Sequence, residues 1–220
     1  MIKDYAEIKK AICFDIGGTL LENKNNNSLI EKLINICEGC EYSEIVFAAK
    51  ESFMKSKTSL VVASKYFCEF LHLDETIYIK VYETLKNHRS ESIIFVEVLE
   101  VLKFLKARGY ILLAISNNYF WNTNQVFNNN LSEYFDYVLY SYECNSVKPD
   151  KKIFKEMEYL TELRSKEILL VGDSWTSDVV GAKKAGWDII YINRDLHHKC
   201  MIHEKSVLVI SNLKELYNYL

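Results

Sequence analysis

Proline and glycine are scarce in this chain, and they are unevenly distributed. One proline, Pro149, and seven glycines occur in 220 residues. Between Glu22 and Ile94 there is no proline, and Gly39 is the only glycine. Because these residue types mark the turns that strand-rich architectures use often, this stretch is predicted to consist of packed helices. Its apolar residues recur at every third or fourth position, which indicates about four helices.

Long apolar runs and an excess of positive charge are absent as well. Apolar runs such as Ile111–Ile115 and Ile168–Val171 are far shorter than the roughly 18 residues that a membrane-spanning helix needs. The formal net charge of −3 lacks the basic excess that binding to a nucleic-acid backbone requires. Asp4, Glu7 and Asp15 interrupt any apolar segment of a secretory signal. We therefore expect a cytoplasmic protein that binds neither membranes nor nucleic acid, and the sequence leaves its oligomeric state open.

The six cysteines are spread through a chain that is large enough to fold without disulfides, so we expect reduced thiols. Cys37 and Cys40 form a single Cys-x-x-Cys pair, whereas a zinc site normally takes four ligands. A second, loose group near the C-terminus comprises His197, His198, Cys200 and His203. Helix packing is the favoured interpretation of the pair and a polar surface loop that of the group, with a transition-metal site as the alternative.

Outside the glycine-poor stretch, short apolar runs alternate with helical patterns. The runs expected to form strands are Ala11–Phe14, Ile111–Ile115, Tyr137–Tyr140, Ile168–Val171, Ile189–Ile192 and Val207–Ile210. Most are separated by predicted helices, at Phe95–Arg108, Lys151–Leu163 and Ser177–Ala185. Unbroken apolar strands that alternate with helices are typical of a parallel sheet covered on both faces. The predicted fold class is therefore α/β, with an inserted helical segment.

Polar residues follow four of the predicted strands. In open parallel sheets, ligands bind at the carboxyl ends of the strands. In chain order, the residues at these ends are Asp15, Gly17 and Thr19, then Ser116 and Asn117, then Lys148, and finally Asp173 and Asp178. Each has an ordinary structural interpretation as a turn or helix-cap residue. Their order, with each set past a different strand, favours a shared site.

The residue types in this set suit phosphoryl transfer. Asp15 can attack phosphorus if a cation screens the repulsion between the two anions. Oxygen ligands from Asp15 and Asp173, with a backbone carbonyl and waters, describe a Mg²⁺ site. Thr19, Ser116 and the Lys148 ammonium can then hold the phosphoryl oxygens. A covalent aspartyl-phosphate would split the reaction into two easier steps.

Together these residues resemble the four motifs of the haloacid dehalogenase (HAD) superfamily, with a helical, C1-type cap inserted after the first motif. The first motif corresponds to Asp15 and Thr19, the second to Ser116, the third to Lys148, and the fourth to Asp173 and Asp178 in a Gly-Asp-Ser-x-x-x-Asp segment. The resemblance covers roughly the whole chain, and the last segment is highly specific.

The resemblance implies a Rossmann-like core formed by residues 1–21 and 95–220, and a cap formed by residues 22–94. It also implies a phosphoaspartyl intermediate and a cap that closes over a small phosphorylated metabolite. The implied Mg²⁺ ligands are Asp15, the main-chain carbonyl of Gly17, Asp173 and Asp178, and the implied substrate contacts are Ser116, Asn117 and Lys148.

One position departs from the pattern of family phosphatases. They usually carry a second aspartate two residues after the nucleophile, which protonates the leaving alkoxide and later deprotonates the attacking water. Here Gly17 stands at that position. A positioned general acid or base is worth roughly 10² to 10⁴ in rate, or about 3 to 5 kcal/mol. We therefore expect the chain to keep its metal binding but to react slowly with substrates that have poor leaving groups.

Three explanations of Gly17 stay open. The leaving group can be acidic, as in an acyl phosphate or a phosphoanhydride, and depart without a proton. A cap residue can replace the aspartate, and the candidates are Glu22, Lys50, Lys55, Lys57, His72 and His88. Alternatively, the protein binds a ligand or partner without useful turnover.

Other enzyme classes explain less of the sequence. Phosphonoacetaldehyde hydrolases of the same superfamily also lack the second aspartate and use a cap lysine as a Schiff base, but their usual first motif differs. Haloacid dehalogenases themselves need no metal. The presence of the Gly172-Asp173 pair therefore argues against assigning this chain to them. The segment from Asp15 to Thr19 also resembles the first phosphate motif of sugar kinases with the actin-like fold, where further strands follow rather than helices.

Aromatic residues after the second motif are a weaker signal. Tyr119, Phe120 and Trp121 follow Ser116 closely and could line the entrance to the site. Packing in the interior is the favoured interpretation of these side chains.

Overall fold

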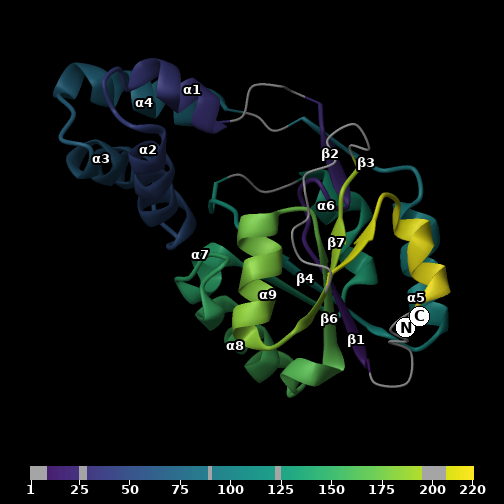
Figure 1. Cartoon of the computed structure of the whole chain (residues 1–220). Coiled ribbons are helices and arrows are strands. Elements are labelled where there is room, and N and C mark those ends of the chain that lie inside the picture. The colour runs from purple at the N-terminus through teal and green to yellow at the C-terminus, as the bar shows by residue number, and fades with distance from the viewer. Residues whose placement is uncertain (1–8, 25–28, 89–90, 122–124, 195–206) are drawn as a thin grey trace.

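A computed structural model describes residues 9–24, 29–88, 91–121, 125–194 and 207–220, and Figure 1 shows its helices and strands. The main sheet has the order β5-β4-β1-β6-β7-β8, and every neighbouring pair is parallel. Its strands are β1 (Ala11–Phe14), β4 (Ile111–Ser116), β5 (Tyr137–Tyr140), β6 (Ile168–Gly172), β7 (Asp188–Ile192) and β8 (Leu208–Ile210). The predicted α/β class with a Rossmann-like parallel sheet is confirmed.

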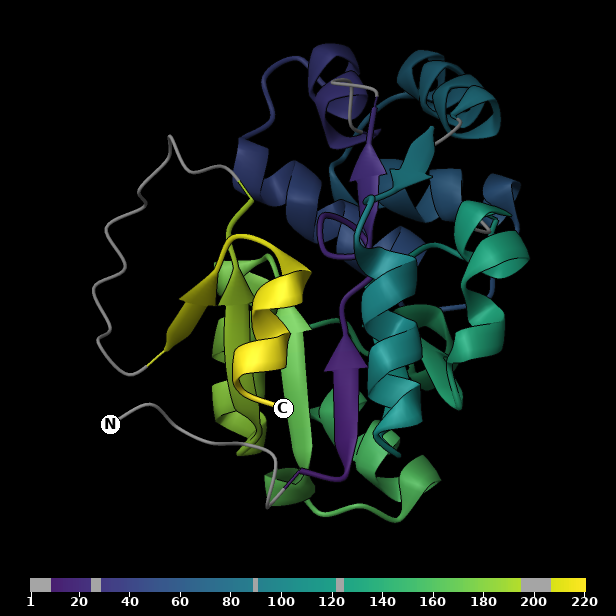
Figure 2. The same cartoon turned by 90° about the vertical axis from the view of Figure 1, so that its right-hand side faces the viewer.

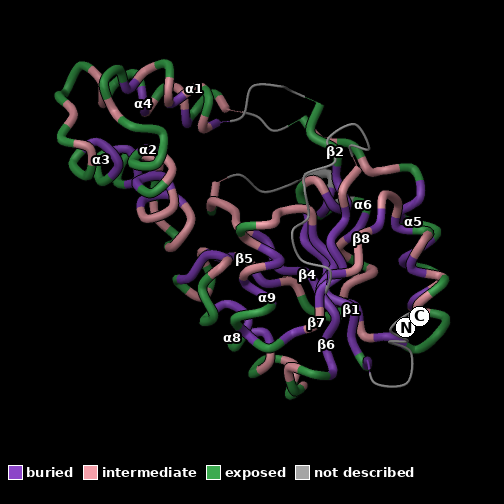
Figure 3. The backbone as a smooth tube through the Cα atoms, in the orientation of Figure 1, coloured by how far each residue is buried: buried purple, intermediate pink, exposed green. Residues whose placement is uncertain are grey.

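The central strands are buried on both faces, as their unbroken apolar runs predict. All residues of β1 and β6 are buried, and Figure 3 shows the sheet as the most buried part of the fold. Alternate residues point to opposite faces, so Ile12 and Phe14 join one apolar cluster while Ala11 and Cys13 join the other.

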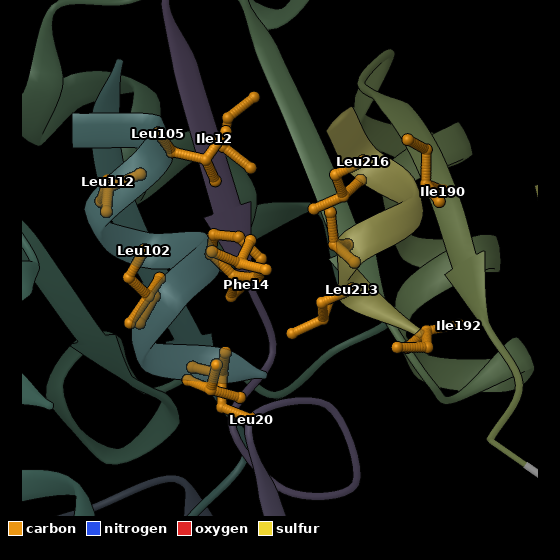
Figure 4. Close-up of a cluster of buried hydrophobic side chains, with 14 of the residues drawn as sticks. Ile12, Phe14, Leu20, Leu102, Leu105, Leu112, Ile190, Ile192, Leu213 and Leu216 are labelled. Carbon is orange, nitrogen blue, oxygen red and sulfur yellow. The ribbon is translucent and has the colours of Figure 1, made fainter. Parts of the chain in front are cut away.

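Helices cover both faces of the sheet. On one face lie α5 (Val98–Ala107) and η5 (Leu213–Asn218), whose Leu102, Leu105, Leu213 and Leu216 pack on Ile12 and Phe14 (Figure 4). On the other face lie α8 (Lys151–Thr161) and α9 (Val180–Ala185). Shorter elements complete the core: α6 (Gln125–Asn130), η2 (Ser132–Tyr134), α7 (Ser141–Cys144), η3 (Ser165–Glu167) and the π-helix η4 (Trp175–Val179).

The stretch poor in glycine and proline is helical, as predicted. It contains α1 (Leu29–Ile36), α2 (Tyr42–Ala49), the π-helix η1 (Lys50–Met54), α3 (Leu60–Phe70) and α4 (Glu75–Asn87). These helices bury an apolar cluster of their own. Side chains cap α3 and α4, since Ser59 accepts the Val62 amide proton and Asp74 accepts those of Thr76 and Ile77. We call this helical unit the cap.

A short antiparallel ribbon connects the cap to the core. It pairs β2 (Leu21–Asn23) with β3 (Ser92–Ile94), so the chain enters and leaves the cap side by side. The sequence pattern does not indicate these strands, because three residues are too few to show a period of two. Figure 2 shows the arrowheads of the main strands pointing toward the cap, which therefore lies over their carboxyl ends.

The cap also packs against a core loop. Tyr119 and Trp121, just after β4, join the apolar cluster of the cap, and the rings of Trp121 and Phe53 lie 5.7 Å apart. The favoured packing interpretation of these two aromatics is therefore confirmed. Phe120, in contrast, is 45% exposed. A second contact joins Lys57 of the cap to Glu143 of α7, with Nζ and Oε1 3.7 Å apart.

Three further predictions concern the Cys-x-x-Cys pair, the group near the C-terminus and membrane-spanning helices. Cys37 and Cys40 are free thiols; Cys37 is buried in the apolar cluster of the cap and Cys40 is half-buried against it, in agreement with helix packing. The group around His197 and Cys200 lies outside the described residues. In the described ranges, no helix is both long and apolar enough to span a membrane.

Candidate active site

The parallel register brings three of the predicted site residues to one edge of the sheet. Phe14 at the end of β1 pairs with Ala114 of β4 and with Val171 of β6. Asp15 follows directly and is held by its amide, which donates to the Val171 carbonyl at 2.9 Å. Ser116 therefore ends the strand on one side of Asp15, and Asp173 follows the strand on the other side.

Lys148 lies at the centre of the cluster, although no strand carries it. Its Nζ donates to Asp15 Oδ1 at 2.5 Å, to Asp178 Oδ1 at 2.6 Å and to the Ile115 carbonyl at 3.2 Å. These contacts use the three protons of the ammonium. Burial disfavours the charged ammonium, but the two carboxylates outweigh that effect and raise the pKa of Lys148. The lysine is therefore held in its charged form beside Asp15.

Asn117 fixes the backbone of that lysine. Its Oδ1 accepts the Lys148 amide proton at 2.7 Å, and its Nδ2 donates to the Lys148 carbonyl at 3.0 Å. The side chain therefore positions Lys148, while its role as a substrate contact stays a prediction. The peptide bond that follows, between Lys148 and Pro149, is cis.

Asp178 is fully buried, and both of its oxygens have partners. Oδ1 accepts from Lys148 Nζ, and Oδ2 accepts the Ser174 amide proton at 2.9 Å. Gly172 makes room for it, since a Cβ at that position would lie 2.5 Å from the Asp178 carboxyl carbon. Asp178 is therefore a second buried carboxylate, besides Asp15, that holds the Lys148 ammonium.

Asp15, Asp173 and Asp178 form a set of oxygen donors that suits a divalent cation. One carboxylate oxygen from each lies within 4.8 Å of the other two. Thr19 is buried beside them, with Oγ1 3.4 Å from Asp173 Oδ1. Burial, with repulsion from neighbouring carboxylates, raises the pKa values of Asp15 and Asp173 despite the nearby Lys148 ammonium. A bound divalent cation would reduce the repulsion among the three carboxylates, and carboxylate oxygens are ligands that Mg²⁺ prefers.

Comparison with known proteins agrees with this geometry. A family model described as haloacid dehalogenase-like hydrolase matches residues 9–186. The chain belongs to this hydrolase family. The matched segment includes the residues of all four motifs, and the predicted family is confirmed.

Individual relatives share only parts of this HAD hydrolase. It is 37% identical over 82 residues to Rhythmically expressed gene 2 protein of Drosophila melanogaster, covering 36% of this chain and 28% of that protein. It is 30% identical over 117 residues to Glyceraldehyde 3-phosphate phosphatase of Methanothermobacter thermautotrophicus. The aligned segment covers 51% of this chain and 52% of that protein. The aligned segments thus span from about a quarter to about a half of these relatives.

A solved structure shares the fold over nearly the whole chain. The putative HAD-hydrolase YfnB from Bacillus subtilis, bound to magnesium, gives a TM-score of 0.63 at 19% identity. The superposition covers 96% of this chain and 97% of that one. At this identity the likeness shows the fold alone.

Gly18 lets the first motif approach the acidic cluster. Its φ is +75°, which L side chains rarely adopt, and a Cβ there would lie 2.0 Å from Asp173 Oδ2. We expect Gly18→Ala to displace the Asp173 carboxylate and to weaken Mg²⁺ binding at least about tenfold in calorimetric titration.

Gly39→Ala is the matched control for that substitution. Gly39 has a similar φ of +86°, but no atom lies within 4 Å of the added Cβ. The control carries comparable backbone strain and is expected to leave Mg²⁺ affinity unchanged. Equal losses in both variants would contradict a role for the Gly18 contact.

Arg194 is a site-supporting residue that the sequence analysis missed. It follows β7, and its guanidinium donates to the Gly18 carbonyl at 3.2 Å and the Thr19 carbonyl at 2.7 Å. The same group pairs with Glu97 at 2.7 Å and lies 3.5 Å from the Phe95 ring centroid. Arg194 thus ties the first motif to the segment leaving the cap. Functional residues of parallel sheets follow the carboxyl ends of strands. The same rule could have predicted Arg194, because it follows a fifth strand, β7.

The candidate cap replacements for the missing aspartate lie in different places. Lys55 pairs with Glu51 at 2.5 Å, and Lys57 pairs with Glu143. His72 lines a groove in the cap beside Phe47 and Phe70. The others also spread over separate elements: Glu22 is exposed on β2, Lys50 begins η1 and His88 follows α4. Replacement of the missing aspartate by one of these residues therefore stays a prediction.

Proposed function

We propose that this HAD hydrolase cleaves small phosphorylated metabolites in a Mg²⁺-dependent reaction, through an aspartyl-phosphate on Asp15. The observation that carries the proposal is the position of the Asp15 carboxylate. It lies 2.5 Å from the Lys148 ammonium and within 4.8 Å of two further carboxylates that can share a cation. A relative named as a phosphatase supports the same class of reaction.

The donor set of the site fits Mg²⁺. Asp15, Asp173 and Asp178 would hold the ion, together with the main-chain carbonyl of Gly17. When bound, the ion would screen the repulsion between the Asp15 carboxylate and an anionic phosphoryl group.

Asp15 would attack the phosphoryl group, and the side chains around it would stabilise the charge on that group. An Asp15 carboxylate oxygen forms a bond to phosphorus, and the bond from phosphorus to the leaving oxygen breaks, with its electron pair going to the leaving group. Lys148, Thr19 and Ser116 would stabilise the charge on the phosphoryl oxygens. Water then attacks the aspartyl-phosphate, which releases inorganic phosphate and restores the carboxylate.

Gly17 limits the leaving groups that this site would handle well. With no carboxyl group at this position, an alkoxide would depart without a proton from the first motif. We therefore propose that acidic leaving groups, such as those of acyl phosphates, react fastest.

A phosphatase assay with acetyl phosphate, with and without Mg²⁺, tests the proposal. We expect turnover that requires Mg²⁺ and is lost in Asp15→Asn, together with a beryllium fluoride adduct that only the unmodified protein forms. Turnover of the same size in Asp15→Asn would contradict the aspartyl-phosphate.

A second candidate function follows from Gly17 as well. The same fold and metal site would serve a protein that binds a phosphorylated ligand without useful turnover. This alternative predicts Mg²⁺-dependent binding of phosphate compounds with neither hydrolysis nor a phosphoenzyme, so the same assay separates it from the first proposal.

A further inference from the structure

The loop at residues 16–21, which we call the first-motif loop, folds back on itself through its own backbone groups. The Ile16 carbonyl accepts the amide protons of Leu20 and Leu21, each at 3.0 Å. The Leu21 carbonyl accepts the amide proton of Gly18 at 2.8 Å. These bonds close the two ends of the loop, and the carbonyls in its middle are bound by a side chain from another part of the chain.

A single guanidinium binds the two carbonyls in the middle of this loop. Arg194 Nε donates to the Gly18 carbonyl at 3.2 Å, and its Nη2 donates to the Thr19 carbonyl at 2.7 Å. Thr19 is fully buried, so an apolar replacement of Arg194 would remove a hydrogen bond from a polar group in the interior, which is unfavourable. The shape of the loop therefore depends on a side chain that lies 175 positions further along the chain.

Glu97 and Phe95 hold the guanidinium itself in place. Arg194 Nη1 donates to Glu97 Oε1 at 2.7 Å, and its Cζ lies 3.5 Å from the Phe95 ring centroid. The same Glu97 oxygen accepts the Leu213 amide proton at 3.5 Å. Burial alone would raise the pKa of Glu97, but hydrogen bonds from Arg194 and from backbone amides outweigh that effect and lower it. The pair of Arg194 and Glu97 therefore carries both charges and adds no net charge to the site.

The two residues that Arg194 binds are also the ones against which Asp173 rests. Gly18 approaches the Asp173 carboxylate so closely that a Cβ at this position would collide with it. Thr19 Oγ1 lies 3.4 Å from Asp173 Oδ1. A shift of the loop would therefore move this carboxylate, which is one of the three that can share a cation.

We propose that Arg194 is a positioning residue for the metal site, which fixes the first-motif loop so that Asp173 keeps the orientation in which it shares a cation with Asp15. The inference rests on the proposed function, because it takes both carboxylates as Mg²⁺ ligands. Glu97 supports this role, since it holds the guanidinium against the loop. The forked shape of the guanidinium decides the effect rather than its charge, because it has to donate in three directions at once.

Mg²⁺ titration of Arg194→Lys tests the proposal. Lysine keeps the positive charge but lacks the planar fork of donors. In calorimetry we expect Mg²⁺ to bind at least about tenfold more weakly than to the unmodified protein, and the Mg²⁺ concentration for half-maximal turnover of acetyl phosphate to rise by a similar factor. A purely structural role would lower the amount of active protein without shifting that concentration. An unchanged Mg²⁺ affinity would overturn the proposal.

Chemical rescue of Arg194→Ala isolates the contribution of the guanidinium. The Arg194 side chain is 18% exposed, so the space that it leaves is open to solvent. We expect guanidinium chloride, far below the concentrations that unfold the protein, to restore Mg²⁺ affinity, whereas ammonium chloride at the same concentration restores none. Equal responses to the two salts would contradict a role for the fork. Should Arg194→Ala fail to fold, Arg194→Lys decides the question.

Arg164→Ala is the matched control for these substitutions. Arg164 also pairs with a glutamate, since its Nη2 lies 3.0 Å from Glu167 Oε1. This pair precedes β6 and therefore lies at the amino end of that strand, away from the edge that carries Asp15. We expect its loss to leave Mg²⁺ affinity unchanged and without a response to guanidinium. A loss as large as that in Arg194→Ala would mean that removing any such pair suffices, and the proposal would fail.

Glu97→Gln tests the support of the guanidinium. It keeps the shape of the side chain but removes the charge that holds Arg194. We expect a smaller loss of Mg²⁺ affinity than in Arg194→Ala, and no further loss when the two substitutions are combined. Additive losses would contradict an effect of Glu97 through Arg194.

Hydrolysis of acetyl phosphate by the unmodified protein separates this inference from the proposed function. If acetyl phosphate is hydrolysed but Arg194→Lys binds Mg²⁺ as tightly as the unmodified protein, only the role of Arg194 fails. If acetyl phosphate is not hydrolysed and no phosphoenzyme forms, the proposed function fails, and the Mg²⁺ affinities still decide the role of Arg194. An unmodified protein that binds no Mg²⁺ would overturn both.

Discussion

Gly17→Asp is expected to raise kcat for alkyl phosphates by roughly 10²- to 10⁴-fold, because it restores a proton donor beside the leaving oxygen. The backbone accepts the change. Nothing lies within 4 Å of a Cβ at this position, and Gly17 does not have the left-handed φ of its neighbour Gly18. Gly17 is also exposed, so the added carboxyl group faces the open side of the first motif.

Steady-state rates on a series of phosphate esters with leaving groups of graded acidity provide the measurement. The gain is expected to be largest for alkyl esters and to vanish for acetyl phosphate, whose leaving group needs no proton. Gly17→Asn has the same shape without the titrating carboxyl group and serves as the control. A rate gain in Gly17→Asn, or the absence of a gain in Gly17→Asp, would contradict the role assigned to this position.

Lys148→Met is expected to lower the free energy of unfolding by about 3 to 5 kcal/mol in buffer without divalent ions. The substitution keeps the length and apolar stem of the side chain but removes the ammonium that bonds both Asp15 and Asp178. The two carboxylates are buried and would then repel each other without compensation. Because Mg²⁺ can supply part of the missing charge, we expect it to restore more stability to the variant than to the unmodified protein.

Chemical denaturation with and without Mg²⁺ measures both effects. Lys9→Met is the comparison variant, since Lys9 is also buried and bonds Asp188 at 2.6 Å with two carbonyl oxygens nearby. Lys9 precedes β1, at the opposite end of the strand from Asp15. Its loss is expected to cost stability that Mg²⁺ does not return. A Mg²⁺ response of equal size in the two variants would rule out the specific role of Lys148.

The sequence determined the strands of the main sheet almost completely. The six apolar runs became its six strands, with ends that shift by at most one residue, because a strand buried on both faces has to be apolar along its length. The same order of elements determined where the site would lie, since parallel strands bring their carboxyl ends to one edge. The sequence alone therefore placed Asp15, Ser116 and Asp173 together at this edge.

Tertiary structure alone decided how those residues contact one another. Nothing local in the sequence indicates that Lys148 reaches Asp15 across 133 positions, that Asn117 fixes the Lys148 backbone, or that Arg194 ties the first motif to the exit from the cap. The three-residue strands β2 and β3 of the connecting ribbon could not be predicted either. Apolar periodicity reports which side of an element is buried, whereas hydrogen bonds and cavities depend on which elements meet, and only the packed chain determines that.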